Sequence, residues 1–203
     1  KKLKIGTKLV AGFVLVAIIA GLIGTIGILN LRMIAQRDKE LYEKVTKPME
    51  YAAHIIERFH RLRVNVYILI LSKSEGEFNR SERQINAHLS AFNENMDKVK
   101  QTLMSDVAKQ LFDNVLKEKE KYLTYLKEII SLTRQKKNDA VLAMAKSDGV
   151  TRATELQKTI DALMKRKVDD GQEMEEANSA IAKSSTALLI GISDAGFIIA
   201  FVL

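Results

Sequence analysis

The sequence predicts an all-α protein: an antiparallel, up-down-up-down four-helix bundle flanked by two transmembrane helices. Three observations support this class. The 203-residue chain contains a single proline, and its middle shows no strand-like alternation. A long apolar segment lies near each end of the chain. The middle carries charges of both signs and repeats apolar residues every three or four positions, as the buried seams of bundle helices do.

The first apolar segment, residues 9–30, contains no charged residue. As a helix it spans roughly 30 Å, the thickness of a bilayer's hydrocarbon core. A cleaved signal peptide has a shorter apolar region of about 7–15 residues, so we expect a retained transmembrane helix. The basic tail before it, residues 1–8, predicts a cytoplasmic N-terminus.

The second apolar segment, residues 187–203, is near the lower limit for a membrane span. We expect it to be the truncated start of a second transmembrane helix in a longer polypeptide. Asp194 within it is either paired or protonated in the membrane, or interfacial in a span that begins near Ala195. The interfacial alternative is favoured because a charge at the bilayer centre costs about 2.5–3.5 kcal/mol. Two spans would place the intervening domain, residues 31–186, in the periplasm or outside the cell.

Four apolar stripes predict the helices of this domain, and they begin at Ala52, Ile85, Ala108 and Ala153. Turn-forming residues separate the stripes, at Gly76, Met104–Asp106 and Gly149. The first bundle helix should therefore end near Ser72, and the next three should start near Phe78, Ser105 and Val150. The segment NDAVLAMAK predicts a short extra helix before the last one.

Two local features leave alternatives open. Pro48 either starts a new helix or kinks a continuous one, and the kink is favoured because the apolar phase continues through it. Asn79 with Glu82, or Ser81 with Gln84, would cap the second bundle helix.

A second apolar face on the first bundle helix predicts a homodimer. Val64, Ile68 and Leu71 lie opposite its core stripe, and a helix that is apolar on two faces needs two partners. A locally hydrophobic surface is the alternative. In the first span, small residues at intervals of four would let two copies approach closely; they are Ala17, Gly21 and Thr25.

Just before that apolar face, Arg58, Arg61 and Arg63 crowd the same helix, with Asn65 adjoining Arg61. Guanidinium groups at a partly dried interface grip carboxylates through two hydrogen bonds each. The cluster predicts an anion pocket between two copies of the helix. The alternative is that these arginines pair with acids of their own chain.

Other classes of function are disfavoured. The chain has no cysteine and none of the common catalytic motifs, so we expect no enzyme activity, no metal and no cofactor. Four of the seven net positive charges lie in the N-terminal tail, so nucleic acid is not an expected partner.

Polar residues interrupt the apolar stripe of the last helix near Lys167, Asp170 and Gly171. We expect them to loosen this helix, and apolar replacements there should lock signalling.

The N-terminal LKIGTKLVAGF, the first span, the helical domain with its NDAVLAMAK segment and the second span together resemble the front end of a bacterial methyl-accepting chemotaxis receptor of the four-helix-bundle sensor class. The resemblance implies a homodimer in the inner membrane with a periplasmic sensor domain. It also implies a HAMP linker and a signalling coiled coil beyond this segment, contacting cytoplasmic signalling partners.

In that family, amino acids bind across the dimer interface to arginines on the first bundle helix and to a polar patch on the last. Arg58, Arg61 and Arg63 occupy a similar region, and Thr151 and Thr154 are rough counterparts of the patch. The implied function is detection of an amino or organic acid. The same front end on a histidine kinase or a cyclic-dinucleotide enzyme is one alternative, and an anchored, non-signalling bundle that binds a protein is another.

Overall fold

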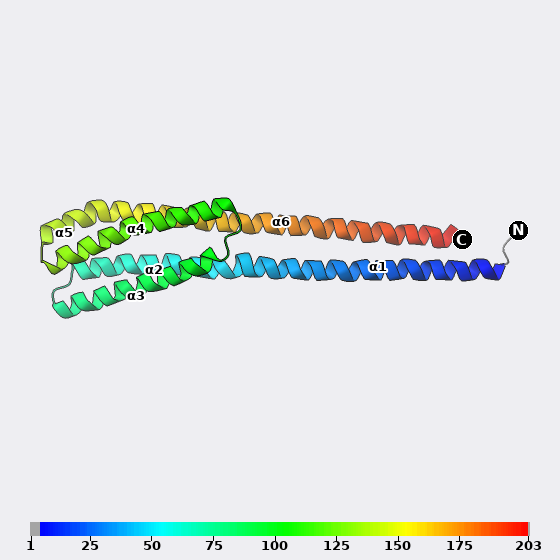
Figure 1. The fold of residues 1–203 in the computed structure, drawn as a ribbon, viewed down its shortest axis with the longest axis horizontal. Coiled ribbons are helices and arrows are strands. Elements are labelled where there is room, and N and C mark those ends of the chain that lie inside the picture. The colour runs from blue at the N-terminus through cyan, green and yellow to red at the C-terminus, as the bar shows by residue number, and fades with distance from the viewer. Residues whose placement is uncertain (1–4, 203) are drawn as a thin grey trace. The chain divides into compact units, whose positions relative to one another are not determined.

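The computed structural model describes residues 5–202, and every element in that range is helical (Figure 1). The described chain forms two compact units. Unit 1 contains the residues up to Leu41 and those from Gln172 onward, and unit 2 is Tyr42–Gly171. The elements in order are α1 (Ile5–Leu41), a π-helical turn (Tyr42–Thr46), α2 (Lys47–Ile70), α3 (Glu75–Lys100), α4 (Asp106–Arg134), α5 (Asn138–Met144), a second π-helical turn (Ala145–Gly149) and α6 (Val150–Val202).

Unit 2 is a four-helix bundle, as predicted. In it α2 and α3 run antiparallel, and so do α4 and the first part of α6 (Figure 1). The predicted stripes form the core, because the same three- and four-residue spacing puts their side chains on one face of each helix. The fully buried residues of these stripes include Ile55, Leu69, Ile85, Val99, Val115, Ile129, Ile160 and Leu163.

Polar contacts between helices reinforce the seam of α3 and α4. Arg134 donates to Glu82 at 2.7 Å, and its guanidinium lies 4.9 Å from the centre of the Phe78 ring. Lys119, a polar residue that interrupts the apolar stripe of α4, donates to Asn93 at 3.3 Å. The interruption is therefore a cross-link between helices rather than a break in the core.

The two long helices after the connections begin at serine caps. Ser105 has extended backbone and its Oγ accepts from the Ala108 N–H at 3.1 Å, so α4 starts where predicted. For α3 the cap is Ser74, which accepts from the Glu77 N–H at 3.3 Å. The predicted caps at Asn79 and Ser81 are wrong, because α3 already begins at Glu75 and Ser81 is buried in its interior.

Two glycines predicted to form turns lie in helical geometry instead. Gly76 occupies the first turn of α3, and Gly149 ends the second π-helical turn, which leads directly into α6. The sharp reversal is at the end of α4, where Lys136 has a φ of 57°. Its N–H bonds to Thr133 and the Lys137 N–H bonds to Leu132, the paired contacts of a Schellman motif.

The chain stays helical through Pro48, as the kink interpretation requires. Pro48 also lies in the first turn of α2, directly after the π-helical turn, and is buried. Proline has no N–H and crowds the carbonyl four residues earlier, which is that of Lys44. The buried Lys167 of α6 supplies a donor to this carbonyl: its Nζ lies 2.8 Å from the Lys44 oxygen.

Lys167 also joins the α3–α4 connection to this point. Its Nζ lies 2.7 Å from the carbonyl oxygen of Thr102 and 3.3 Å from the Thr102 Oγ1. Burial lowers the pKa of Lys167, and nearby Asp170 opposes that effect. Asp170 is itself buried and pairs with Arg166. The expectation that Lys167 loosens the last helix is therefore replaced by a cross-link among three segments.

Gly171 makes the closest backbone approach in the same region. A Cβ added at Gly171 would lie 2.5 Å from Cγ1 of Val45, a distance that requires one of the two to move. Glycine is therefore required here for packing, since any larger residue would push α6 away from the π-helical turn.

Unit 1 pairs α1 with the remainder of α6. Arg37 donates to Asn178 at 3.2 Å, and a Cβ on Gly196 would lie 2.9 Å from Ile19. Both helical runs that pass through this unit are long and apolar enough to cross a membrane. A Cβ at Gly21 would meet open space, and Asp194 is exposed within α6.

Candidate functional site

The predicted arginine cluster lies on α2, and helix geometry distributes it over two faces. Successive residues turn by about 100° around an α-helix. Around the helix axis, Arg61 is therefore about 60° from Val64, whereas Arg58 is about 120° from it on the same side and Arg63 about 100° from it on the other side. In one chain the three guanidinium groups do not form a common pocket.

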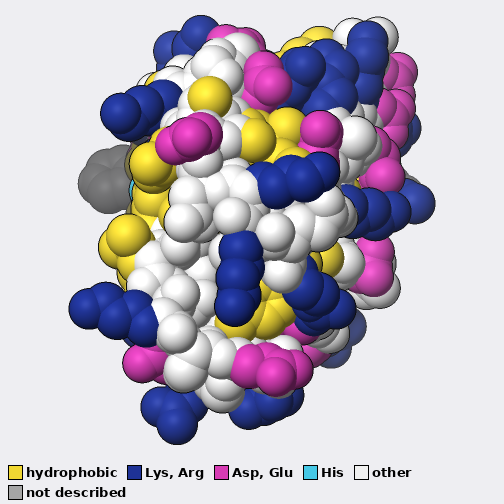
Figure 2. Space-filling model, turned by 90° about the vertical axis from the view of Figure 1, so that its left-hand side faces the viewer, with side chains coloured by type: hydrophobic (Ala, Val, Ile, Leu, Met, Phe, Trp, Pro, Cys, Tyr) yellow, Lys and Arg dark blue, Asp and Glu magenta, His cyan; other side chains and the backbone are white. Residues whose placement is uncertain are grey.

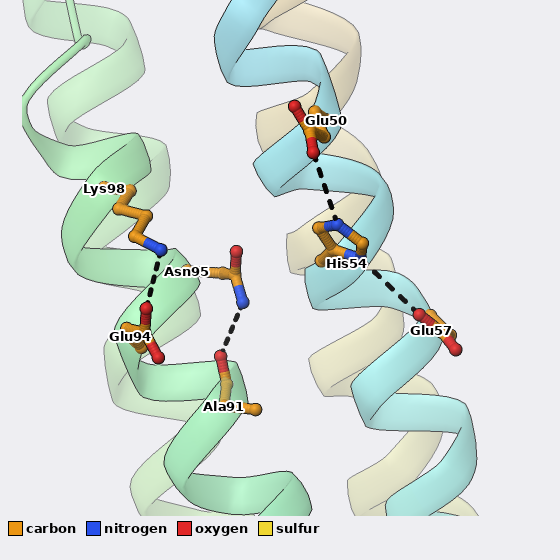
Figure 3. A network of polar contacts seen from close by, with 7 residues as sticks. All are labelled: Glu50, His54, Glu57, Ala91, Glu94, Asn95 and Lys98. Atoms are coloured by element: carbon orange, nitrogen blue, oxygen red, sulfur yellow. Dashed lines mark hydrogen bonds and ion pairs between the residues drawn. The ribbon is translucent and has the colours of Figure 1, made fainter.

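Arg61 is the most exposed of the three and is held by a neighbour. Its Nε donates to Glu57 at 2.7 Å, and Glu57 in turn lies 3.5 Å from Nδ1 of His54. Figure 3 shows His54 between Glu57 and Glu50 on α2. The hydrogen bonds from Arg61 and His54 lower the pKa of Glu57, so this carboxylate stays ionised. Arg61 thus matches the alternative in which an arginine pairs with an acid of its own chain.

Arg58 is half-buried and faces α3. Its Nε is buried and has no hydrogen-bond partner among the described residues. On α3, the pKa of His88 is lowered by burial first and then by the charges of Arg58 and Arg61. On this side of α2, Arg58 therefore keeps one unsatisfied donor, while Glu57 offsets the charge of Arg61.

Arg63 lies over the aromatic part of the core. Its guanidinium carbon is 5.9 Å from the centre of the Phe59 ring, within the range of a cation–π contact. Phe59 packs edge-on against Tyr122 of α4 at 5.3 Å. Burial raises the pKa of Tyr122 well above its usual value, and the charge of Arg63 acts against this.

The other predicted ligand residues are partly engaged within the chain. Asn65 donates its side-chain amide to the Arg61 carbonyl at 2.9 Å, and Thr151 donates to the Ser147 carbonyl at 3.0 Å. Thr154 is exposed on α6. The structure does not bring the two threonines together with the arginines in a single enclosed site of one chain.

The second apolar face of α2 is exposed in the single chain. This exposure is what a face that contacts a second copy would show in a monomer. Val64, Ile68 and Leu71 are 56, 50 and 73% exposed, and Tyr67 beside them is 48% exposed. Single exposed apolar residues are ordinary, but a contiguous row of four is typical of an interaction surface.

A groove that the sequence analysis did not find lies elsewhere on unit 2. It has a volume of about 210 Å³ and is lined by α4 on one side and by the end of α5, the second π-helical turn and the start of α6 on the other. Figure 2 views the molecule from the end at which α5 lies, and basic and acidic side chains are interspersed there rather than separated. The groove is mixed in charge as well.

The fold and these surfaces define a class: a helical bundle with an exposed apolar face, joined to two helices long and apolar enough to cross a membrane. The family of four-helix-bundle sensory modules for signal transduction matches residues 2–182, and the chain belongs to this family. Its members are sensory rather than catalytic modules. No curated protein gave a match, and no solved structure did.

Proposed function

We propose that the chain is the sensing and membrane-anchoring part of a receptor for a small carboxylate. Unit 2 would lie in the periplasm or outside the cell, and the apolar parts of α1 and α6 would cross the inner membrane. The observation that carries the proposal is that α6 (Val150–Val202) runs as one helix from the sensory bundle into an apolar segment. A change sensed in the bundle would then reach the other side of the membrane along this helix.

The active form would be a homodimer formed through Val64, Ile68 and Leu71. Arg61 borders this apolar face and Arg58 lies beside Arg61 on the side toward α3, so two copies would bring their Arg61 guanidinium groups together at the edge of the face. A carboxylate at that position would accept charge-assisted hydrogen bonds from the exposed Arg61 groups of both copies. Arg63, Asn65, Thr151 and Thr154 would contribute from the flanks.

Signalling would follow from differential binding. A ligand that binds one arrangement of the dimer more tightly shifts the population toward it, and helix shifts at such interfaces are about 1–2 Å. Helix α6 would carry this shift to signalling partners in the cytoplasm. Chemotaxis receptors are the output class that the resemblance favours.

Binding and topology test the proposal with the whole chain in lipid nanodiscs or vesicles. We expect one member of a panel of amino and organic acids to raise the unfolding temperature, and Arg61→Gln to abolish that rise. Arg80→Gln, an exposed arginine on α3, serves as the control. If no carboxylate binds, the anion-sensing proposal is wrong and a protein ligand becomes the better candidate.

For topology, the absence of cysteine lets single cysteines be introduced one at a time. In inside-out vesicles, a maleimide that cannot cross membranes should label Gly6→Cys and leave Lys117→Cys unlabelled. The reverse pattern would contradict the proposed orientation.

A further inference from the structure

The groove beside α4 has its positive and negative charges at opposite ends. Lys121, Tyr125 and Glu128 line it from α4, at intervals of four and three residues that place them on one face. Asp148 and Arg152 line it from the facing elements, one helical turn apart.

Because α4 and α6 are antiparallel, the position of each of these side chains along the bundle axis follows from its residue number. Asp148 lies close enough to Tyr125 to raise its pKa, and the adjacent Gly149 approaches the Tyr125 hydroxyl. Asp148 is therefore level with Tyr125. Since α4 runs toward the α5 end of the bundle and α6 runs away from it, Arg152 is level with Lys121. Both cations thus lie at one end, and Glu128 with Asp148 lies toward the other.

Most of these charged groups have no partner among the residues that the structure describes. The side chains of Glu128, Asp148 and Arg152 form no hydrogen bond or ion pair with any residue in the range 5–202. Lys121 pairs with Glu118 at 2.6 Å on its own helix. A small-molecule ligand could therefore contact three of the four charges without breaking an existing contact.

The backbone on one side of the groove departs from α-helical geometry and leaves space for the Tyr125 hydroxyl. The segment Ala145–Gly149 is a π-helical turn, a feature often found at functional sites. A Cβ on Gly149 would lie 2.6 Å from the Tyr125 hydroxyl oxygen, so glycine leaves that hydroxyl its place at the groove. The ring of Tyr125 is buried, and burial together with Tyr67 and Asp148 raises its pKa to about 12, which keeps the hydroxyl protonated.

We propose that this groove binds a linear zwitterion, with its carboxylate at Arg152 and Lys121 and its ammonium at Asp148 and Glu128. The two ends are separated by about one to two helical turns, roughly 6–10 Å along the axis. An α-amino acid with an uncharged side chain has its ammonium and carboxylate groups on the same carbon and cannot reach both ends, whereas an ω-amino acid can. The volume is below the roughly 300–1,000 Å³ of pockets for drug-sized ligands, which suits a molecule of this size.

This site goes beyond the proposed carboxylate site on α2 and does not depend on it. A ligand here would tie α4 to the start of α6 within one chain, without a second copy. Occupancy would therefore act on the helix that leads into the apolar segment.

Calorimetric titration of the full chain in nanodiscs tests the proposal with a matched set of probes: 5-aminopentanoate, pentanoate and pentylammonium. We expect 5-aminopentanoate to bind, and each single-charge probe to bind at least about tenfold more weakly, because each lacks one set of charged contacts. Arg152→Gln and Asp148→Asn should each weaken 5-aminopentanoate binding by a similar factor. Their unfolding temperatures without ligand verify that both variants fold.

Arg61→Gln separates this site from the one proposed on α2, and it should leave 5-aminopentanoate binding unchanged. The groove proposal is overturned if pentanoate binds as tightly as 5-aminopentanoate, if the groove variants bind it normally, or if it does not bind at all. Loss of binding in Arg61→Gln alone would assign the zwitterion to the α2 site instead.

Discussion

The cross-link made by Lys167 yields the sharpest stability prediction. Replacing Lys167 with methionine keeps most of the side-chain volume but removes the ammonium group. The carbonyls of Lys44 and Thr102 would then lose their donor, and Pro48 ensures that Lys44 has no α-helical N–H to replace it.

The expected magnitude follows from these contacts. Both hydrogen bonds are part-buried, and a hydrogen bond to a charged group contributes about 1.5–3 kcal/mol, so the loss of two costs about 3–6 kcal/mol. Removing a buried ammonium recovers part of this, since its charge is desolvated in the native state. We expect a net loss of about 2–4 kcal/mol in the free energy of unfolding, or roughly 6–15 °C in unfolding temperature for a unit of this size.

The assay is thermal unfolding of the full chain in nanodiscs, combined with hydrogen exchange at the α3–α4 connection. Lys165→Met, an exposed lysine on the same helix, is the matched control and should change little. Unchanged stability and unchanged exchange in Lys167→Met would refute the role of Lys167 as a cross-link.

The same residue predicts a pH dependence. Because burial lowers the pKa of Lys167 below its ordinary value of 10.5, the unfolded chain binds more protons than the native one between the native pKa and 10.5. The contribution of Lys167 to stability should therefore rise with pH through that window and be smaller below it. The difference between wild type and Lys167→Met isolates this slope from those of other groups. If the stability difference between wild type and Lys167→Met does not change with pH, the pKa of Lys167 is not lowered in the native state.

Four further changes test other features of the structure. Gly171→Ala should cost about 1–3 kcal/mol by overpacking, and adding Val45→Ala should restore part of the loss; additive effects would rule out their contact. Ser105→Ala should cost about 1 kcal/mol through loss of the α4 cap, measured by thermal unfolding, and no change would mean that the cap is dispensable. Lys136→Gly should stabilise the chain by about 0.5–1 kcal/mol because its φ is positive, and a lower unfolding temperature would contradict the assigned turn. Leu71→Cys should form an intermolecular disulfide under mild oxidation if α2 is the dimer face, and a persistent monomer on non-reducing gels would argue against it.

The core of the bundle could be predicted because its signal is local. The spacing of Ala52, Ile55 and Phe59 alone defines a face, and that face is buried. The Ser74 cap was also within reach, since Ser74 and Glu77 have the spacing of a capping box. The predicted turn at Gly76 is incompatible with this cap, because Gly76 lies in the first turn of α3. Glycine is tolerated at that position of a helix.

The contacts of Lys167 and the groove could not be predicted in the same way. Lys167 meets Thr102 and Lys44, which are 65 and 123 residues away along the chain. A single sequence does not say which helices face each other, or at what level. From the sequence alone, a lysine in an apolar stripe therefore predicted weak packing of the last helix. Only the positions of the Thr102 and Lys44 carbonyls show that the ammonium group of Lys167 is hydrogen-bonded. The groove was missed for the same reason, because Asp148 and Tyr125 are on different elements.

The close packing of Gly171 against Val45 has a consequence for how sequences of this family can diverge. A side chain at position 171 and a branched side chain at position 45 exclude each other, so relatives that share this packing should change the two positions together. The same holds for Pro48 and Lys167. Where a residue with an N–H replaces the proline, that N–H can donate to the carbonyl of residue 44, and the lysine is no longer needed as its donor. Correlated substitution at these two pairs of positions would be the evolutionary trace of the contacts described above.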